Sequence, residues 1–438
     1  MSELVKRVRA WFTSIISIES LLREQKLLLF AMLFYFCANS VSSVFLNLFI
    51  YQTTVNSSGL LSVDALTNVI LYNIYTYVIL IAMTCFTGMF AKRIPTKGSM
   101  LAGLSMHILL FVFVLLTDTN AHKYLWLFAA LNGIGSALYN VAYNEILGYA
   151  FDERSKRLFI FIVGVCMTLA GIFTPIVAGS FIQVGRNMNG YIAAFGTALV
   201  MLALSVAFVL CVRLQKKKKI QRAYFANVLV SIFKDTNLRF VHLAELVRGI
   251  REGVIAFLLP VLIYTLCENA VAVGIYVALC AVLQMLGEWH VMHTGNENNR
   301  MGLMLFAVAV MILTTAVFLF GFSVMSIYAY GVLTALIAGF LYVPIVGIYH
   351  WATNRITNSA KKTLEIQSAR ELFVTVGKVI GALAALLLHK SNALVAVIFV
   401  INLILILTWV LFSRVGEEEE QNVLLTETKE TEIENNAD

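Results

Sequence analysis

The sequence predicts an all-α membrane protein, a bundle of twelve helices arranged as two pseudo-symmetric halves of six. Of its 438 residues, 60% are hydrophobic and 13% are charged, far from the balance of a soluble domain. The charged residues gather in short clusters between long apolar runs. About twelve of these runs reach the length of about 20 residues that crosses a bilayer as a helix. Lipid offers no hydrogen-bond partners, so every backbone N–H and C=O in the membrane must be paired within the protein. Because the runs do not alternate like barrel strands, we expect them to be helices.

The predicted helices follow one another along the whole chain with short connections. They begin near Leu27, Leu66, Ser99, Tyr124, Leu158, Tyr191, Phe240, Ala270, Gly302, Ile327, Glu371 and Ala393. The organisation that we predict is an amphipathic cytoplasmic segment (1–26), a first half (27–213), a basic cytoplasmic linker (214–238), a second half (239–414) and an acidic disordered tail (415–438).

Lys and Arg residues in the short loops predict the orientation of the bundle. They gather on one side of the predicted spans, at Lys6, Arg7, Arg9, Arg23, Lys26, Lys92, Arg93, Lys97, Arg154, Lys156, Arg157, Lys216 to Lys219, Arg222, Lys234, Arg300, Arg355, Lys361 and Lys362. The loops of the other side hold little beyond Lys123, Arg186 and Lys390. Cytoplasmic loops of membrane proteins carry the excess of positive charge. We therefore expect a multi-pass protein of the cell membrane with both termini in the cytoplasm.

Composition and motifs also argue against several classes of function. The net charge of +7 belongs to the loops, so we expect no nucleic-acid partner. No G-x-x-x-x-G-K-[ST] loop occurs, and no G-x-S-x-G or H-E-x-x-H motif is present, which disfavours an ATP-driven pump and an enzyme. The six cysteines stand singly without metal-ligand spacing. We expect neither a metal site nor a cofactor.

Short fragments recur across the basic linker and indicate an internal duplication. Residues 155–159 (SKRLF) resemble residues 368–373 (SARELF), and Leu138-Tyr139 in the fourth span matches Leu341-Tyr342 in the tenth. With the span count and the linker, these matches favour two repeats that rock about a central cavity.

A loop after the second span carries a family resemblance. Residues 88–97 read GMFAKRIPTK and resemble G-x-L-A-D-R-x-G-R-K, the signature loop of the major facilitator superfamily; the fitting positions are Gly88, Ala91, Arg93 and Lys97. The resemblance covers nearly the whole chain and implies two six-helix bundles around a site near the midplane. Lys92 replaces the family's aspartate, which removes a charge that the family uses to latch its cytoplasmic gate. The resemblance implies a gating role for Gly88, Arg93 and Lys97. In the fifth span, Gly171, Pro175 and Gly179 resemble a glycine-proline motif of the family's antiporters, or serve helix packing.

The seventh span holds the densest group of ionisable residues expected inside the membrane. Glu245, Arg248 and Glu252 are three and four residues apart and share a helical face, with Arg251 beside them. Each intramembrane charge costs about 2.5–3.5 kcal/mol, which marks such residues as functional candidates. The functional interpretation is a cavity wall where an arginine binds an anionic group and a glutamate exchanges a proton. The alternative is an internally neutralised ladder of ion pairs that pins neighbouring helices.

The eleventh span carries a second polar stripe, formed by Glu371, Thr375 and Lys378. We expect Lys378 to pair with Glu252, so that protonation or substrate binding could break the bridge and shift the bundle between its two facings. A structural bridge that never opens is the alternative.

The first half is polar without being charged. Amides, hydroxyls and phenols recur with helical spacing in three spans, at Asn39, Ser43 and Asn47, at Asn68, Tyr72 and Tyr75, and at Asn132, Ser136, Asn140 and Asn144. Such groups suit hydrogen bonding to a polar substrate, or serve as interhelical glue.

Together these features predict a secondary active transporter that works by alternating access on a small polar or amphiphilic solute with a negative group, coupled to protons. The substrate and coupling candidates are Asn39, Asn140, Asn144, Glu245, Arg248, Arg251, Glu252 and Lys378. The expected partners are a small-molecule substrate, protons and membrane lipids. Two alternatives stay open: a lipid flippase of the same fold, and a scaffold that no longer transports but holds partner proteins or lipids.

Overall fold

The structure is a computed structural model. It describes residues 21–58, 62–90, 94–149, 153–185, 188–213, 224–295, 299–321, 323–356, 362–388 and 394–415. Within these ranges all regular secondary structure is helical. Most of the predicted amphipathic segment, Arg93 of the signature loop, residues 214–223 of the linker and nearly all of the acidic tail lie outside the described residues.

The helices of the first half run from α2 to α8. They are α2 (Arg23–Val41), the π-helix η2 (Ser42–Leu46), α3 (Asn47–Ser58), α4 (Ser62–Phe90), α5 (Thr96–Thr117), the 3-10 helix η4 (Asp118–Lys123), α6 (Leu125–Tyr149), α7 (Glu153–Val184) and α8 (Met188–Cys211). The short helix α9 (Phe225–Lys234) lies within the segment predicted as the linker. The second half contains α10 (Thr236–Cys267), α11 (Ala270–Thr294), α12 (Arg300–Thr314), the 3-10 helix η6 (Thr315–Phe320), α13 (Val324–Asn354), α14 (Thr363–Leu388) and α15 (Leu394–Leu403), whose span continues to Val415.

Twelve spans in the described chain are long and apolar enough to cross a membrane, which confirms the predicted fold class. Eleven of them begin within four residues of the predicted positions. The eleventh span in order, α14, begins at Thr363 rather than near Glu371. Its first two turns carry the polar residues Glu365, Gln367 and Arg370, so the apolar run that predicted the span begins after the helix itself.

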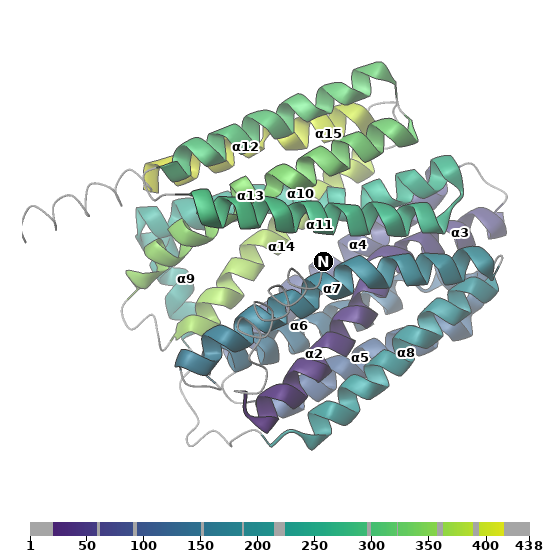
Figure 1. The fold of residues 1–438 in the computed structure, drawn as a ribbon, viewed down its shortest axis with the longest axis horizontal. Helices are drawn as coiled ribbons and strands as arrows, with labels where there is room; N and C mark the ends of the chain where they lie inside the picture. The colour runs from purple at the N-terminus through teal and green to yellow at the C-terminus, as the bar shows by residue number, and fades with distance from the viewer. Residues whose placement is uncertain are drawn as a thin grey trace, which may run out of the picture.

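The bundle consists of two groups of six spans that lie side by side. Figure 1 shows the first half, coloured purple to teal, below the second half, coloured green to yellow. The two groups meet where α7 packs on α11 and α4 packs on α14. Alternation of the spans places the starts of α2, α10 and α12 at one end of the bundle. This end also carries α9, Lys97, Arg300 and Lys362, and is called the basic end below.

The two halves are hydrogen-bonded to each other at the opposite end of the bundle. The hydroxyl of Tyr264 on α10 donates to Gln52 on α3 at 3.2 Å, and the backbone N–H of Ala270 donates to Gln183 on α7, also at 3.2 Å. Gly179 of α7 permits this contact, because a Cβ there would collide with the backbone of Ala270. The glycine of the fifth-span motif thus packs one half against the other.

Candidate functional site

Close packing of α10 on α14 positions the ionisable side chains of the second half. Gly249 and Gly253 of α10 face Gly377 and Gly381 of α14, and a Cβ at any of the four would meet the backbone of the other helix. Small residues of this kind let two membrane helices approach until their backbones touch. Side chains that flank the four glycines are therefore brought together from both helices.

The flanking charges form a continuous row of ion pairs, called the ladder below. Glu245 is fully buried and accepts hydrogen bonds from Arg248 and from Arg370 of α14, both at 2.7 Å. Arg248 also pairs with Glu252 one turn further along α10. The ladder Arg370–Glu245–Arg248–Glu252 contains two cations and two anions, and it is electrically neutral.

The predicted pair between Lys378 and Glu252 is not formed. Glu252 pairs with Arg248 of its own helix, because a spacing of four residues places the two side chains side by side. The ammonium of Lys378 lies over the ring of Tyr77 on α4, 6.0 Å from its centroid. Lys378 therefore contacts the first half of the protein rather than closing a bridge within the second.

A cavity of about 510 Å³ lies beside these residues and is called the larger cavity. Its wall comes mainly from α10, α11 and α13, with Lys378 from α14 and Tyr77 from the first half. Arg251 and Glu252 line it together with aromatic and polar groups, Tyr276, Gln284, Thr334 and Tyr342. The volume falls in the range of about 300–1,000 Å³ that is typical of small-molecule sites.

Arg251 is held in the wall of the larger cavity by uncharged partners. Its Nε donates to Asn402 of the twelfth span at 2.9 Å, and the amide of Asn402 donates to the hydroxyl of Tyr330 at 2.7 Å. Within the described chain neither Arg251 nor Lys378 takes part in an ion pair. The two cations give the larger cavity a positive charge that the neutral ladder does not cancel.

A second cavity of about 280 Å³, the smaller cavity, lies between the halves toward the basic end. Asn140, Tyr143 and Asn144 of α6 line it from the first half. The second half contributes Arg248, Gln367, Arg370, Glu371 and Val374. The predicted candidates Asn140 and Asn144 thus face the charged helices across the gap between the halves.

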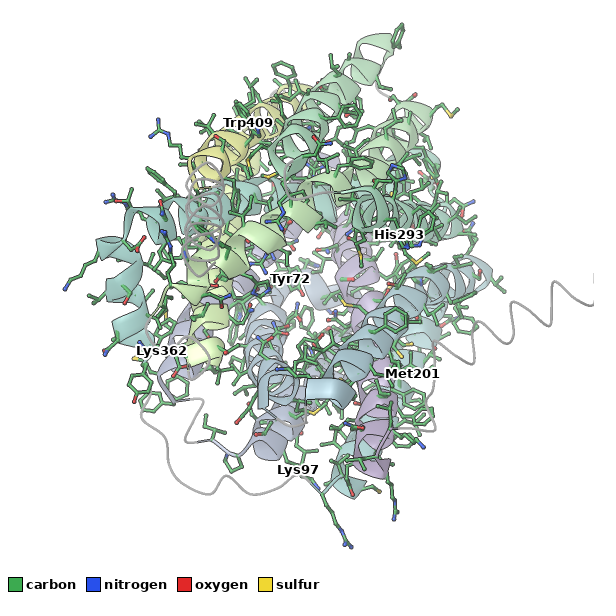
Figure 2. The ribbon with its side chains drawn as sticks, turned by 60° about the vertical axis from the view of Figure 1, so that its left-hand side comes forward. Tyr72, Lys97, Met201, His293, Lys362 and Trp409 are labelled. Atoms are coloured by element: carbon green, nitrogen blue, oxygen red, sulfur yellow. The ribbon has the colours of Figure 1, made fainter. Side chains whose placement is uncertain are left out.

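Most of the other polar stripes of the first half are satisfied within that half. Asn73 donates to Asn47 at 2.8 Å, and Asn132 donates to Tyr72 at 2.8 Å. Figure 2 shows Tyr72 deep within the bundle, in keeping with its exposure of 2%. Asn39, a predicted substrate residue, lines neither of the two cavities. The amides of Asn47, Asn73 and Asn132 therefore act as interhelical glue, whereas Asn140 and Asn144 line the smaller cavity.

The residues of the signature loop make contacts that differ from one another. Gly88 packs under the ring of Phe225 on α9, where a Cβ would approach the ring to 2.8 Å. Lys97 donates to the carbonyls of Leu210 and Val212 at the end of α8, at 2.7 and 2.9 Å, and so caps that helix within the first half. Figure 2 places Lys97 at the margin of the bundle.

Several residues of the site were not predicted from the sequence. Arg370 and Gln367 precede the predicted start of the eleventh span, and Tyr77 was not distinguished from its aromatic neighbours. Asn402 carried a usable signal, because a lone amide in a very apolar span must find a partner. No group of three His, Cys, Asp or Glu side chains in the described ranges lies close enough to hold a metal ion.

Comparisons with known proteins match this architecture. The family described as Major Facilitator Superfamily matches residues 28–361. The chain belongs to the major facilitator superfamily. The sequence is 25% identical over 301 residues to the uncharacterized protein YqgE of Bacillus subtilis (strain 168), covering 69% of this chain and 70% of that one. It is 29% identical over 186 residues to an uncharacterized protein in the sodM 3' region of Geobacillus stearothermophilus, covering 42% of this chain and 83% of that one.

Solved structures of transporters share the major facilitator fold of this chain. A bacterial homologue of the iron transporter ferroportin in its inward-facing state has a TM-score of 0.70 at 13% identity, covering 91% of this chain and 99% of that one. A POT family transporter in complex with 5-aminolevulinic acid has a TM-score of 0.65 at 13% identity, covering 90% and 96%. At these identities the likeness concerns the fold. In this superfamily member the larger cavity lies mainly within the second half, and the smaller cavity lies between the two halves.

Proposed function

We propose that the protein is a secondary active transporter whose larger cavity binds a small polar or amphiphilic solute through an anionic group. The observation that carries the proposal is the pair of cations, Arg251 and Lys378, which line that cavity and form no ion pair among the described residues. A buried charge without a counter-ion is costly, and a bound anion would neutralise it. A guanidinium and an ammonium are also the groups that bind carboxylate and phosphate most strongly.

The aromatic wall of the larger cavity supports an amphiphilic solute. Tyr77, Tyr276 and Tyr342 surround the two cations, while Leu259 and Val277 add apolar surface. Sites for small molecules combine such surfaces with a few placed polar groups. The anionic group would meet Arg251 and Lys378, and the rest of the solute would pack on the rings.

Alternating access is proposed from the uneven closure of the bundle. The hydrogen bonds of Tyr264 and Ala270 join the halves at the opposite end, and the smaller cavity lies between the halves toward the basic end. We propose that the basic end faces the cytoplasm, as the loop charges predict. Breaking the hydrogen bonds at the opposite end would let the halves rock and expose the larger cavity to the other side of the membrane.

Proton coupling is proposed at Glu252. Among the described residues that line the larger cavity, Glu252 is the one carboxylate, and its side chain is 24% exposed. Protonation of Glu252 would remove a negative charge from the wall of the larger cavity, where the anionic group of the solute would bind. Uptake of a proton and binding of an anion would therefore favour each other.

A thermal-shift screen of the detergent-purified protein tests this function. Organic monocarboxylates, sulfonates, sugars, peptides and lipids are compared on the wild type and on Lys378→Gln. Lys234→Gln, which removes an exposed lysine of α9, is the matched control. We expect organic anions to raise the unfolding temperature of the wild type and the control, and to lose most of that effect in Lys378→Gln. Anions that stabilise all three proteins equally would contradict the proposed site.

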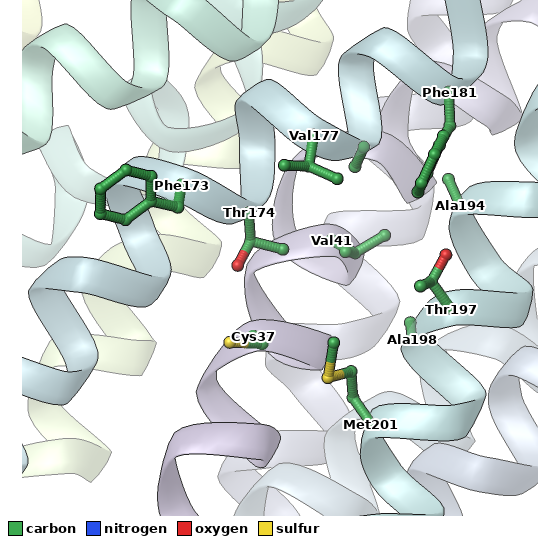
Figure 3. A pocket seen from close by; sticks show the side chains of 11 residues that line it. Cys37, Val41, Phe173, Thr174, Val177, Phe181, Ala194, Thr197, Ala198 and Met201 are labelled. Atoms are coloured by element: carbon green, nitrogen blue, oxygen red, sulfur yellow. The ribbon is translucent and has the colours of Figure 1, made fainter.

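One observation favours lipid as a second candidate cargo. An apolar pocket of about 140 Å³ lies between α2, α7 and α8, and Figure 3 shows Val41, Val177 and Met201 among its lining side chains. Phe173 also lines the pocket, and 62% of its surface is exposed. The pocket suits part of an acyl chain. Stabilisation by lipids alone, independent of Lys378, would favour a flippase.

A further inference from the structure

The smaller cavity contains a carboxylate that the proposed function does not use. Glu371 of α14 lines it, and in the described chain its side chain has neither an ion pair nor a hydrogen bond. Asn140 and Asn144 of α6 line the same cavity, also without side-chain hydrogen bonds among the described residues. Amide oxygens and a carboxylate are acceptors, and together they suit the N–H donors of an ammonium group.

The arginines of the smaller cavity do not cancel the charge of Glu371. Arg248 and Arg370 are both neutralised by the ladder, in which Glu245 and Glu252 supply the two counter-charges. The smaller cavity therefore keeps one negative charge, and the larger cavity keeps the two positive charges of Arg251 and Lys378. The neutral ladder contributes to the walls of both cavities, between two subsites of opposite sign.

The spacing of the two sites follows from α14. Glu371 and Lys378 are seven residues apart, which is close to two helical turns, so both project from the same face toward the first half. The rise of the helix places their Cα atoms about 10.5 Å apart along its axis. The cavities adjoin along α10 as well, because Arg248 lines the smaller one while Arg251 and Glu252 line the larger one.

We propose that the two cavities form one site for a dipolar solute, with an anionic group at Arg251 and Lys378 and a primary ammonium at Glu371, Asn140 and Asn144. This inference rests on the proposed function, which needs the anionic subsite alone. The two charges of the solute lie about 10 Å apart, a distance that an extended chain of about three residues or an ω-amino acid of similar length spans. A short amino acid is too small to reach both subsites.

Equilibrium binding to the full-length detergent-purified protein tests the inference. The probe is 8-aminooctanoate, whose extended chain separates its two charges by about 10 Å. Octanoate lacks the ammonium, octylamine lacks the carboxylate, and 3-aminopropanoate has both charges close together. Affinities are measured by titration calorimetry on the wild type, on Glu371→Gln and on Asp64→Asn, which removes an exposed carboxylate at the opposite end and serves as the matched control.

We expect 8-aminooctanoate to bind the wild type and Asp64→Asn about tenfold or more tightly than octanoate, because it adds a charge-assisted contact. In Glu371→Gln the two affinities should become equal while octanoate binding persists, which also shows that the variant is folded. Equal binding of the two compounds to the wild type, or a preference that survives Glu371→Gln, would overturn the dipolar site but leave the anionic site intact. Tight binding of 3-aminopropanoate would overturn the spanning geometry. If none of the probes binds, the proposed function fails together with the inference.

Discussion

The two halves of the protein use polar residues in opposite ways. In the first half, amides on α3, α4 and α6 form hydrogen bonds within that half, such as Asn73 with Asn47 and Asn132 with Tyr72. In the second half, charged side chains of α10 and α14 form the ladder and line both cavities. The same helical spacing of polar residues therefore produces glue in one half and a charged site in the other.

The difference follows from where each stripe points. A stripe that faces a helix of its own half finds a hydrogen-bond partner there, as Asn132 finds Tyr72. A stripe that faces the other half, as Asn140 and Asn144 do, borders the smaller cavity, where the proposed solute would take the partner's place. Polar spacing alone predicts burial, and only the packing of the helices distinguishes the two outcomes.

Loss of Glu245 should have the largest effect. Glu245→Ala removes the carboxylate that Arg248 and Arg370 share and leaves excess positive charge in the bundle, which typically costs roughly 3–5 kcal/mol. Unfolding in detergent with a chemical denaturant measures the change. The double variant with Arg370→Leu should recover part of the loss, since it also removes the stranded cation. No recovery would mean that the two residues are not coupled in stability.

Substitution in the glycine contact between α10 and α14 should have the next largest effect. A Cβ at Gly377 would meet the carbonyl of Leu246, so Gly377→Ala should destabilise the protein by about 1–3 kcal/mol and reduce transport. Gly196→Ala is the matched control, because nothing lies within 4 Å of its Cβ position. That variant should be neutral or up to about 1 kcal/mol more stable. Equal effects at the two positions would contradict the glycine contact.

Two asparagines on α6 test whether a polar residue holds helices together or binds the solute. Asn132→Leu breaks the bond to Tyr72 and should cost about 0.6–2 kcal/mol of stability, with solute binding retained. Asn140→Leu breaks no hydrogen bond in the described chain and should leave stability unchanged while weakening solute binding. Stability and binding are measured on the same preparations. An exchange of the two phenotypes would reverse the assignment of the stripes.

The smallest effect is expected at the signature loop. Lys97→Met removes two hydrogen bonds to the end of α8, which are worth about 0.3–1 kcal/mol as a helix-terminal interaction. A thermal-denaturation series with added salt checks this value. A larger loss, together with slower transport, would indicate that Lys97 acts in gating, as the family resemblance implies, and not only within the first half.

Most of the fold and part of the candidate site could be predicted from the sequence. Hydropathy located the twelve spans, because length and apolarity are properties of single segments. Helical spacing found the α10 part of the ladder for the same reason, as its residues share one helix. Arg370 was not predicted as a member of the ladder because it lies in polar turns before the apolar part of α14. The role of Asn402 depends on a contact with Arg251, a residue of another helix, which no local sequence pattern predicts. The expected bridge of Lys378 was wrong because a closer partner on α10 satisfies Glu252.

Distances between spin labels at the two ends of the bundle test the central claim most directly. One pair is placed at Val184 and Leu266 at the opposite end, and the other at Met89 and Met292 at the basic end. All four positions are exposed, and each pair joins the first half to the second. Double electron–electron resonance is recorded without solute and with the anion that most stabilises the protein. Alternating access through the larger cavity predicts that the anion lengthens the first distance and shortens the second, and that Lys378→Gln abolishes both changes. Distances that stay fixed in every condition, or that change alike at both ends, would contradict it.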